Sequence, residues 1–285
     1  MTNILNLDSP AKINLRLEIL KKREDGYHEV RTIFQKIDLH DTLHFSLKKA
    51  RRISITTNHP KLPVGKSNLV YKAVQSMLKV SDYKGGFHIE IEKRIPLGAG
   101  LGGGSSNAAT TLKALNQLLR LNLSKKELME MGSKIGADVP FFIGEGAAIG
   151  SGIGEQLKKI DLPNLWFVLI YPNFEVSTRW TYQNFVLTNQ RIHFNLPKFN
   201  KTPKGISRIL LNHLEEVVSK KYPQIDIMKK MVFSAGALGA LMTGSGPTVF
   251  GLFRDEKNAT GAYEKIIKSV GKKGWVVLKA HSITA

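Results

Sequence analysis

Five glycines stand within the seven residues Gly98–Gly104, directly before a pattern typical of an amphipathic helix. Glycine lets backbone N–H groups turn toward a ligand and lets a bulky anion approach closely. Free N–H groups and the dipole at a helix start favour phosphate. We expect Ser105 and Ser106 to cap this helix and to offer hydroxyls to a phosphate or its Mg²⁺ ion. The segment predicts a phosphate-binding loop, against the alternative of a flexible loop before an ordinary helix.

Two other phosphate-binding motifs do not fit this chain. Gly98, Gly100 and Gly103 have the spacing of a dinucleotide fingerprint, but no acidic residue stands about 20 residues further on. Residues 65–67 resemble the end of a P-loop, yet the position that requires glycine is Pro60. The catalytic-loop and metal-binding signatures of protein kinases are also missing.

The elements that must position this loop follow from hydrophobic periodicity. Apolar and polar residues alternate over Ala11–Leu20, which predicts a half-buried strand with Lys12 and Asn14 on the face opposite the core. We expect a turn over 22–28 and a glycine turn over 243–246. Further strands are expected near 32–38, 45–47, 53–55, 87–91, 166–171, 248–253 and 275–279; helices near 68–79, 105–119, 124–131, 207–219, 225–233 and 260–269; and a polar stretch over 189–204. This pattern predicts an α+β protein with two domains, residues 1–158 and 159–285.

Composition sets limits on the function. Lys and Arg number 42 against 23 Asp and Glu, a net charge of +19, which attracts nucleic acid, an anionic membrane or a small phosphorylated substrate. The basic residues form short scattered clusters, more typical of a solvated surface than of a nucleic-acid site. The chain has no cysteine, so disulfides and thiol chemistry are excluded. Without a membrane-length apolar run or a secretory pattern at the N-terminus, we expect a cytoplasmic protein that binds no membrane.

Five segments in the same order resemble a known family. Residues 96–109 resemble the ATP-binding motif of the superfamily that contains galactokinase, homoserine kinase, mevalonate kinase and phosphomevalonate kinase. Within it, Ser9-Pro10-Ala11-Lys12-Ile13-Asn14-Leu15, Asp25-Gly26-Tyr27-His28 and Gly136-Ala137-Asp138-Val139-Pro140 are similar to the 4-diphosphocytidyl-2-C-methyl-D-erythritol kinases, and Thr243-Gly244-Ser245-Gly246-Pro247 resembles the third motif of the superfamily. The resemblance runs from about Ser9 to Pro247.

The resemblance implies a fold and a reaction. The N-terminal domain would resemble domain 2 of ribosomal protein S5, the C-terminal domain would be ferredoxin-like, and the active site would lie in the cleft between them. ATP would phosphorylate the 2-hydroxyl of the cytidylyl-linked methylerythritol of the non-mevalonate isoprenoid pathway. By resemblance, Asp138 is the general base, and Lys12 keeps that base ionised and stabilises charge on the attacking oxygen or the γ-phosphate. Taken alone, Asp138 fits a turn or cap residue and Lys12 a solvated strand lysine.

The remaining site residues also follow from the resemblance. Tyr27 and His28 are expected to recognise cytidine by stacking and hydrogen bonds, with Tyr182 as a second aromatic against the base and Asn14 orienting substrate or phosphate. We expect ATP to contact the loop and two outlying residues: Pro96, Gly98, Ala99, Gly100, Leu101, Gly102, Gly103, Gly104, Ser105, Ser106, Asn68 and Lys93. Mg²⁺ is expected to arrive with ATP, and no residue is assigned as a metal ligand of the protein itself.

Two other functions stay open at this point. Another kinase of the superfamily would act on mevalonate, homoserine or a sugar, whereas Tyr27 and His28 favour the cytidylyl substrate. A basic nucleic-acid-binding protein would explain the net charge and the S5-like fold, and it would bind RNA or DNA with a steep salt dependence. We expect no specific nucleic-acid partner, and either a monomer or a homodimer.

Overall fold

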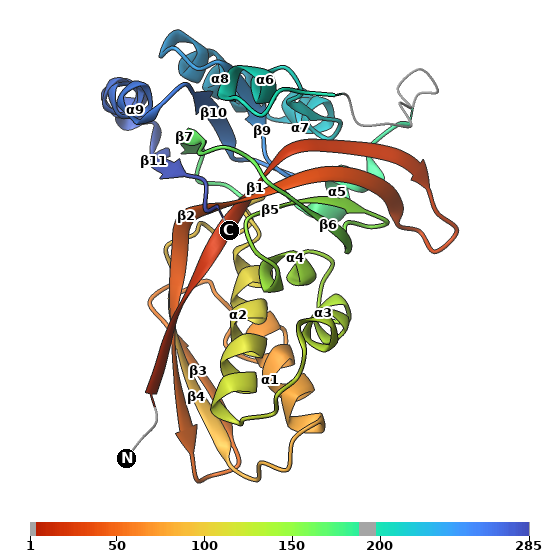
Figure 1. The fold of residues 1–285 in the computed structure, drawn as a ribbon. Helices are drawn as coiled ribbons and strands as arrows, with labels where there is room; N and C mark the ends of the chain where they lie inside the picture. Colours follow the sequence, from red (N-terminus) through yellow and green to blue (C-terminus); the bar gives the residue numbers. More distant parts are fainter. Residues whose placement is uncertain (1–3, 188–197, 285) are drawn as a thin grey trace. The chain divides into compact units, whose positions relative to one another are not determined.

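The computed structural model describes residues 4–187 and 198–284. Runs of strands and runs of helices follow one another along the chain in an α+β arrangement (Figure 1), which confirms the predicted fold class. The chain divides into two compact units. The first unit consists of three segments: the chain up to Ala11, then Leu39–Leu97, and then Gly102–Glu145. The second unit consists of Lys12–Asp38, Gly98–Leu101 and the chain from Gly146 onward. The strands β1 (Ile4–Lys22) and β2 (His28–Lys48) contribute residues to both units.

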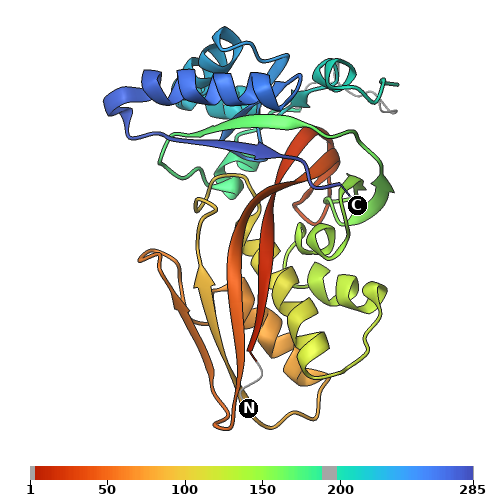
Figure 2. The ribbon, with the colours of Figure 1, turned by 60° about the vertical axis from the view of Figure 1, so that its left-hand side comes forward.

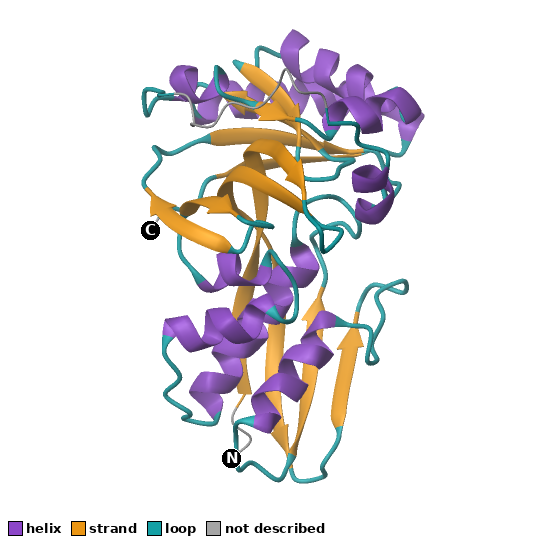
Figure 3. Cartoon of the chain, turned by 90° about the vertical axis from the view of Figure 1, so that its right-hand side faces the viewer, coloured by secondary structure: helices purple, strands orange, loops and turns teal. Residues whose placement is uncertain are grey.

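The first unit is a layer of strands covered on one face by helices, as Figures 2 and 3 both show. The end of β2 pairs antiparallel with β4, with Thr42 opposite Glu92, and β3 joins β4 in parallel. The apolar stripe predicted near residues 68–79 faces the interior and buries Val70, Val74 and Met77. The remaining elements of this unit are β3 (Ile53–Thr57), β4 (Gly86–Glu92), α1 (Leu69–Lys79), α2 (Gly103–Leu118), α3 (Lys125–Ser133) and α4 (Val139–Ile143).

The N-termini of α3 and α2 can be compared with the caps predicted for these two helices. Ser124 and Glu127 form the expected capping box of α3. The predicted cap of α2 is wrong, because this helix begins at Gly103 and its N-cap is Gly102, which has a φ of 72° and makes no side-chain cap. Ser105 and Ser106 therefore lie inside the first turn. A left-handed φ at the N-cap suits glycine, which has no Cβ to strain there.

The second unit contains an antiparallel sheet in the order β11-β7-β10-β9, against which α8 and α9 pack (Figure 2). The start of β2 pairs with β5, and β1 pairs in parallel with β8, with Arg16 opposite Leu211. Its elements are β5 (Ala147–Ser151), β6 (Gln156–Ile160), β7 (Trp166–Tyr171), α5 (Thr178–Gln183), α6 (Pro203–Ser207), β8 (Leu211–Asn212), α7 (Glu215–Lys221), α8 (Gln224–Ser234), β9 (Gly239–Met242), β10 (Val249–Phe253), α9 (Glu256–Val270), the 3-10 turn Gly271–Lys273 and β11 (Val276–His281).

Two sequence predictions in this unit are wrong. The polar face of β1 is buried rather than solvated, with Lys12 only 4% exposed and Asn14 only 2% exposed. The helix predicted over 207–219 is wrong in its first part: α6 ends at Ser207, Leu211 and Asn212 pair with β1 as β8, the His213 N–H donates to Leu17 O, and α7 begins only at Glu215. Of the predicted polar stretch over 189–204, residues 189–197 lie outside the described residues. None of the helices in the described ranges is long and apolar enough to cross a membrane.

Candidate functional site

The glycine segment is built from left-handed backbone positions that lead into α2. Gly98, Gly100 and Gly102 have φ angles of 59°, 78° and 72°. A Cβ at Gly100 would collide with Thr243 O, and one at Gly98 would lie 2.6 Å from the Glu175 Cγ atom. These two glycines are therefore required by conformation and by close contact. The backbone turns into the first N–H groups of α2, the geometry that favours an anion.

Lys12 lies against this segment in the second unit. Its Nζ donates to Gly100 O at 3.0 Å and to Asn14 Oδ1 at 2.6 Å, while its backbone N–H donates to Leu101 O at 3.0 Å. A Cβ placed on Gly244 would be 3.3 Å from the same Nζ atom. Strand β1, the glycine segment and the glycine turn after β9 thus meet around one ammonium group. This arrangement provides positive charge beside a predicted phosphate-binding backbone.

The glycine turn contributes residues that sequence reasoning did not assign a role. Thr243 is fully buried, and its Oγ1 accepts the Asn14 N–H at 2.9 Å. The Thr178 and Ser245 hydroxyls lie 2.7 Å apart and join the start of α5 to this turn. The motif itself was visible in the sequence, but the partners of its hydroxyls are set by residues more than 60 positions away.

The predicted base-recognition residues gather at the start of β2 and on α5. The His28 and Tyr182 rings lie 5.4 Å apart with 35° between their planes, so the structure brings these two predicted residues together. Burial lowers the pKa of His28, and the positive charge of Lys22 lowers it further. A neutral imidazole offers one donor and one acceptor to a base edge. Tyr27 is 61% exposed, and its backbone N–H donates a hydrogen bond to Asp25 Oδ1 at 3.1 Å.

Lys93 and Asp41 form a buried ion pair in the first unit. The Lys93 Nζ atom donates to Asp41 Oδ2 at 2.7 Å and to Ile95 O at 2.5 Å, and the two side chains are 2% and 0% exposed. Burial lowers the pKa of Lys93, while Asp41 acts in the opposite direction. A Cβ on Gly103 would lie 2.9 Å from that Nζ atom. Lys93 therefore lies beneath the start of α2, where it supports the backbone.

Asp41 also organises the approach to the glycine segment. Its Oδ1 accepts the backbone N–H groups of Arg94 and Ile95, both at 2.8 Å. This bonding shapes the turn that precedes Pro96. The sequence contains no motif around Asp41, and its role follows from the pairing of β2 with β4.

The other predicted ATP residues of the first unit have defined local partners. Asn68 is the N-cap of α1, accepting from the Val70 N–H at 2.9 Å and donating to Pro63 O at 2.5 Å. Ser106 is fully buried, with its Oγ 2.8 Å from the Ser9 Oγ, whereas Ser105 is half-buried. Ser105 is thus the more accessible of the two hydroxyls.

Asp138 occupies the N-cap position of α4 but does not act as a cap. Its backbone is in the right-handed helical region, at φ −81° and ψ −12°, and its carboxylate makes no capping hydrogen bond within the described helix. The side chain is half-buried. Asp138 therefore lies in a turn and at a helix N-cap position, as its interpretation as a turn or cap residue predicts, although its side chain makes no capping hydrogen bond. Its role as a base stays a prediction.

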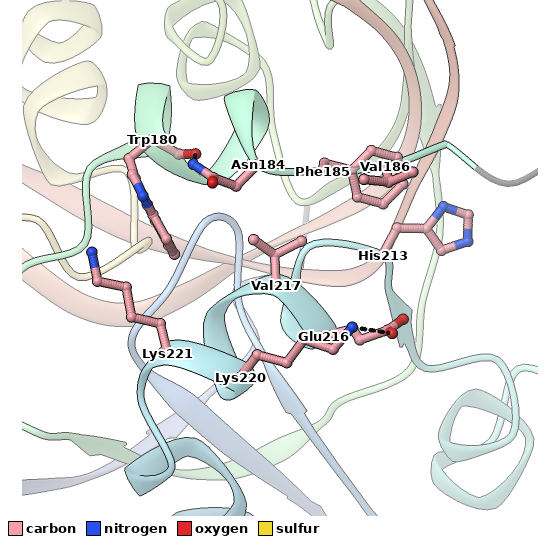
Figure 4. A pocket seen from close by; sticks show the side chains of 9 residues that line it. All are labelled: Trp180, Asn184, Phe185, Val186, His213, Glu216, Val217, Lys220 and Lys221. Atoms are coloured by element: carbon pink, nitrogen blue, oxygen red, sulfur yellow. Dashed lines mark hydrogen bonds and ion pairs between the residues drawn. The ribbon is translucent and has the colours of Figure 1, made fainter.

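A cavity of about 460 Å³ is lined by residues of the α5 region and of α7, and none of the site residues described above lines it (Figure 4). Lys221 lies over the Trp180 ring, with its Nζ atom 4.1 Å from the ring centroid, and the Phe185 ring stacks on His213. Lys220 is paired with Glu216 at 3.0 Å. The sequence did not predict this cavity. It contains none of the glycine-segment residues.

Comparison with known proteins places the chain in a class. Residues 68–146 match the family described as GHMP kinases N terminal domain, and residues 198–273 match GHMP kinases C terminal. These regions lie on either side of the predicted domain boundary after residue 158. A homoserine kinase from Cytophaga hutchinsonii has a similar fold, with a TM-score of 0.76 at 21% identity, covering 100% of this chain and 96% of that one. The chain is an ATP-dependent small-molecule kinase of the GHMP class.

More similar relatives narrow the class to one family. The 4-diphosphocytidyl-2-C-methyl-D-erythritol kinase of Syntrophus aciditrophicus is 47% identical over 284 residues, covering 98% of this chain and 100% of that protein. The corresponding protein of Geobacter metallireducens is 44% identical over 280 residues, with 98% and 99% coverage. A crystal structure of 4-(cytidine 5'-diphospho)-2C-methyl-D-erythritol kinase has a TM-score of 0.82 at 32% identity, with 99% and 100% coverage. The chain belongs to the 4-diphosphocytidyl-2-C-methyl-D-erythritol kinase family.

Proposed function

We propose that this chain transfers the γ-phosphoryl group of ATP to the 2-hydroxyl of 4-diphosphocytidyl-2-C-methyl-D-erythritol. Membership of the family supports the choice of substrate. The observation that carries the proposal is the Lys12 ammonium, which bonds the backbone of the glycine segment at Gly100 O. A buried cation fixed beside an anion-binding backbone is what transfer of a charged phosphoryl group requires.

ATP would bind with its phosphates on the N–H groups of the glycine segment and the first turn of α2. Mg²⁺ is usually held by phosphate oxygens and water together with few protein ligands. The described residues contain no cluster of three or more His, Asp or Glu that could hold a metal ion, and Ser105 offers one accessible hydroxyl. A Mg²⁺ ion brought by ATP would be held by phosphate oxygens, water and the Ser105 hydroxyl, and it would neutralise charge on the phosphates.

In the proposed reaction, Asp138 accepts the proton of the 2-hydroxyl as that oxygen attacks the γ-phosphorus. The bond from the γ-phosphorus to the β,γ-bridging oxygen breaks, and ADP leaves with that electron pair. Lys12 stabilises the negative charge on the transferred group. Asn14 holds the Lys12 ammonium, to which its Oδ1 is bonded.

The cytidine base would be recognised by His28 together with Tyr27 and Tyr182. The 5.4 Å separation of the His28 and Tyr182 rings supports an aromatic site for a base. Stacking on aromatic rings tolerates any base, so hydrogen bonds from the neutral His28 would supply the selectivity for cytosine.

The proposal also covers two residues at the edge of the ATP site, the cellular location, the partners and the domain boundaries. Asn68 and Lys93 would lie near the adenine side, where their local bonds support the backbone around ATP. The protein would work in the cytoplasm as a monomer or homodimer, without a membrane or a specific nucleic acid as a partner. The two domains would be residues 1–158 and 159–285.

Phosphorus NMR on the purified protein with ATP and one acceptor at a time tests the proposal. We expect a new phosphomonoester signal with the cytidylyl acceptor, and none with mevalonate, homoserine or galactose. Turnover of mevalonate without turnover of the cytidylyl acceptor would replace this proposal with that of another GHMP kinase.

A further inference from the structure

The Thr32 hydroxyl lies at the end of a buried hydrogen-bond chain that reaches Lys12. Thr32 Oγ1 donates to Arg16 O at 2.7 Å and accepts from Asn14 Nδ2 at 2.8 Å. The Asn14 Oδ1 atom then accepts from Lys12 Nζ at 2.6 Å. The side chains of Thr32, Asn14 and Lys12 belong to residues that are at most 4% exposed.

The chemistry of these groups allows one orientation of the Asn14 amide. A hydroxyl has a single hydrogen, and Thr32 uses it on Arg16 O, which can only accept. The Thr32 oxygen is left as an acceptor and must face the NH₂ end of Asn14. The carbonyl end then faces the Lys12 ammonium, which can only donate. The reversed amide would set NH₂ against NH₃⁺ in a buried place, at the cost of leaving polar groups unsatisfied.

The surrounding strands hold this chain in place. The Asn14 N–H is bonded to Thr243 Oγ1, so the backbone of the asparagine is fixed as well as its amide. On β5, a Cβ at Gly150 would lie 3.0 Å from the Thr32 methyl group and 2.9 Å from the Phe34 ring. The absence of a side chain at Gly150 gives both residues room. The Phe34 ring centroid is 5.7 Å from Lys12 Nζ, so β2 supports the ammonium through two side chains.

We propose that Thr32 is a positioning residue for phosphoryl transfer: it orients Asn14 and thereby holds the Lys12 ammonium against the glycine segment. The inference rests on the proposed function, because it takes Lys12 as the cation at the transferred phosphoryl group. Thr32 itself touches no reacting atom in this scheme. A valine at position 32 keeps the shape but removes the acceptor, so Asn14 Nδ2 loses its partner and the amide is held only at its Oδ1 end, by Lys12 Nζ and Thr243 Oγ1.

Steady-state kinetics of Thr32→Val provide the first test. A misplacement of about 1 Å can cost about 100-fold in rate, so we expect kcat to fall about 10- to 100-fold with the KM values for ATP and acceptor little changed. Thr32→Ser keeps the hydroxyl and should restore most of kcat. Thr42→Val is the control on the same strand: the Thr42 hydroxyl donates to Asp8 Oδ1 and accepts from Arg94 Nη1, both at 3.0 Å and both exposed. The kcat of this variant should equal that of the unmodified chain.

A double-mutant cycle with Asn14→Ala separates positioning from general destabilisation. If Thr32 acts through Asn14, then Thr32→Val has no further effect on kcat in the Asn14→Ala background. Equal losses of kcat in the two backgrounds, unchanged kcat in Thr32→Val, or a Thr32→Ser variant as slow as Thr32→Val would each overturn the inference. Should Thr32→Val fail to fold, Thr32→Ala takes its place in the cycle with the same expectations.

Lys12→Ala distinguishes a failure of this inference from a failure of the proposed function. If Lys12→Ala keeps the full kcat, the proposed role of Lys12 is wrong and the inference is overturned with it. If Lys12→Ala loses kcat while Thr32→Val retains it, the inference about Thr32 alone is wrong.

Discussion

The two units each contain a buried lysine beside the glycine motif, and the lysines differ in what they join. Lys93 donates to Asp41, which lies on the neighbouring strand β2 and 52 positions away, and to Ile95 O in the turn after β4. Lys12 donates to Asn14 on its own strand and to Gly100 on the glycine segment, 88 positions away. Lys93 pairs its charge with a buried carboxylate, whereas Lys12 donates to an amide oxygen and to a carbonyl of the glycine segment, at the predicted phosphate site.

Burial of a charged side chain therefore does not by itself indicate a chemical role. Buried ion pairs such as Lys93–Asp41 are costly to break but give weak evidence of function. A buried cation that reaches a ligand-binding backbone carries more information, because its charge lies where a phosphoryl group would carry negative charge. Among the acids, Asp41 on β2 accepts backbone N–H groups of the turn after β4 and pairs with Lys93, whereas the proposed role of Asp138 is that of the base.

The largest expected effect separates the two acids. Asp138→Asn should lower kcat by about 10³- to 10⁴-fold while ATP binding stays close to normal, because the amide cannot accept the proton of the hydroxyl. Single-turnover kinetics and ATP titration measure the two quantities. Asp41→Asn is the control, for which we expect lower stability with the chemical step retained. A normal kcat in Asp138→Asn would remove this residue from the role of base.

The next effect concerns stability rather than rate. Lys93→Met leaves the Asp41 carboxylate buried without its cation, and removing one partner of a buried pair costs about 3–5 kcal/mol of unfolding free energy. Urea unfolding measures this loss. Adding Asp41→Asn to Lys93→Met should recover part of it, because the charge is gone and an amide oxygen still accepts backbone N–H groups. A raised KM for ATP with unchanged stability would instead favour a direct nucleotide contact for Lys93.

Lys12→Ala should show the opposite behaviour to Lys93→Met. We expect a fall in kcat of about 10²- to 10³-fold, the usual cost of losing one stabilising group at the reacting centre. The melting temperature should fall less than in Lys93→Met. A Lys12→Ala variant that loses stability but keeps kcat would make the two lysines equivalent and would break the comparison.

A smaller effect is expected at the aromatic pair of the second unit. Tyr182→Ala should raise the KM for the cytidylyl acceptor about 5- to 100-fold, since stacking of a base on an aromatic ring is worth about 1–3 kcal/mol. The KM for ATP and the rate of chemistry at saturation should change little. Tyr182→Phe keeps the ring and serves as the control. An unchanged acceptor KM in Tyr182→Ala would place the base elsewhere.

The smallest effect is a pH dependence of stability at His28. Burial and Lys22 lower its pKa in the folded chain, so the folded state binds a proton there less readily than the unfolded state, whose value is about 6.5. The contribution of neutral His28 to the unfolding free energy is fully present above about pH 6.5. It is lost as the pH falls through the lowered pKa of the folded state. Melting temperatures from pH 5 to 8 should fall less on acidification in His28→Gln than in the unmodified chain. Identical profiles would contradict this prediction.

Local features were predictable because they depend on neighbouring residues. The spacing of apolar residues predicted α1, and β7 over 166–171 has the bounds that were expected. The capping box at Ser124 follows from two side chains three residues apart. Failures came where distant strands intervened, as at β8, where pairing with Arg16 and Leu17 divides a segment with helical spacing. Pairing with a distant strand can override the helical preference of a segment, because the strand partner supplies the backbone hydrogen bonds that a helix would otherwise make.

By itself, the sequence predicted a glycine loop that leads into a helix, which the structure shows, because glycine conformations and a following helix act over a few residues. Its five motifs also indicated the kinase family. Tertiary structure alone decided that the polar face of β1 is buried and that Thr32, Asn14 and Thr243 meet around Lys12. It likewise placed Tyr182 beside His28 and Lys93 against Asp41. The physical reason is that hydrogen bonds between segments depend on strand register and packing, which no local pattern of residues specifies.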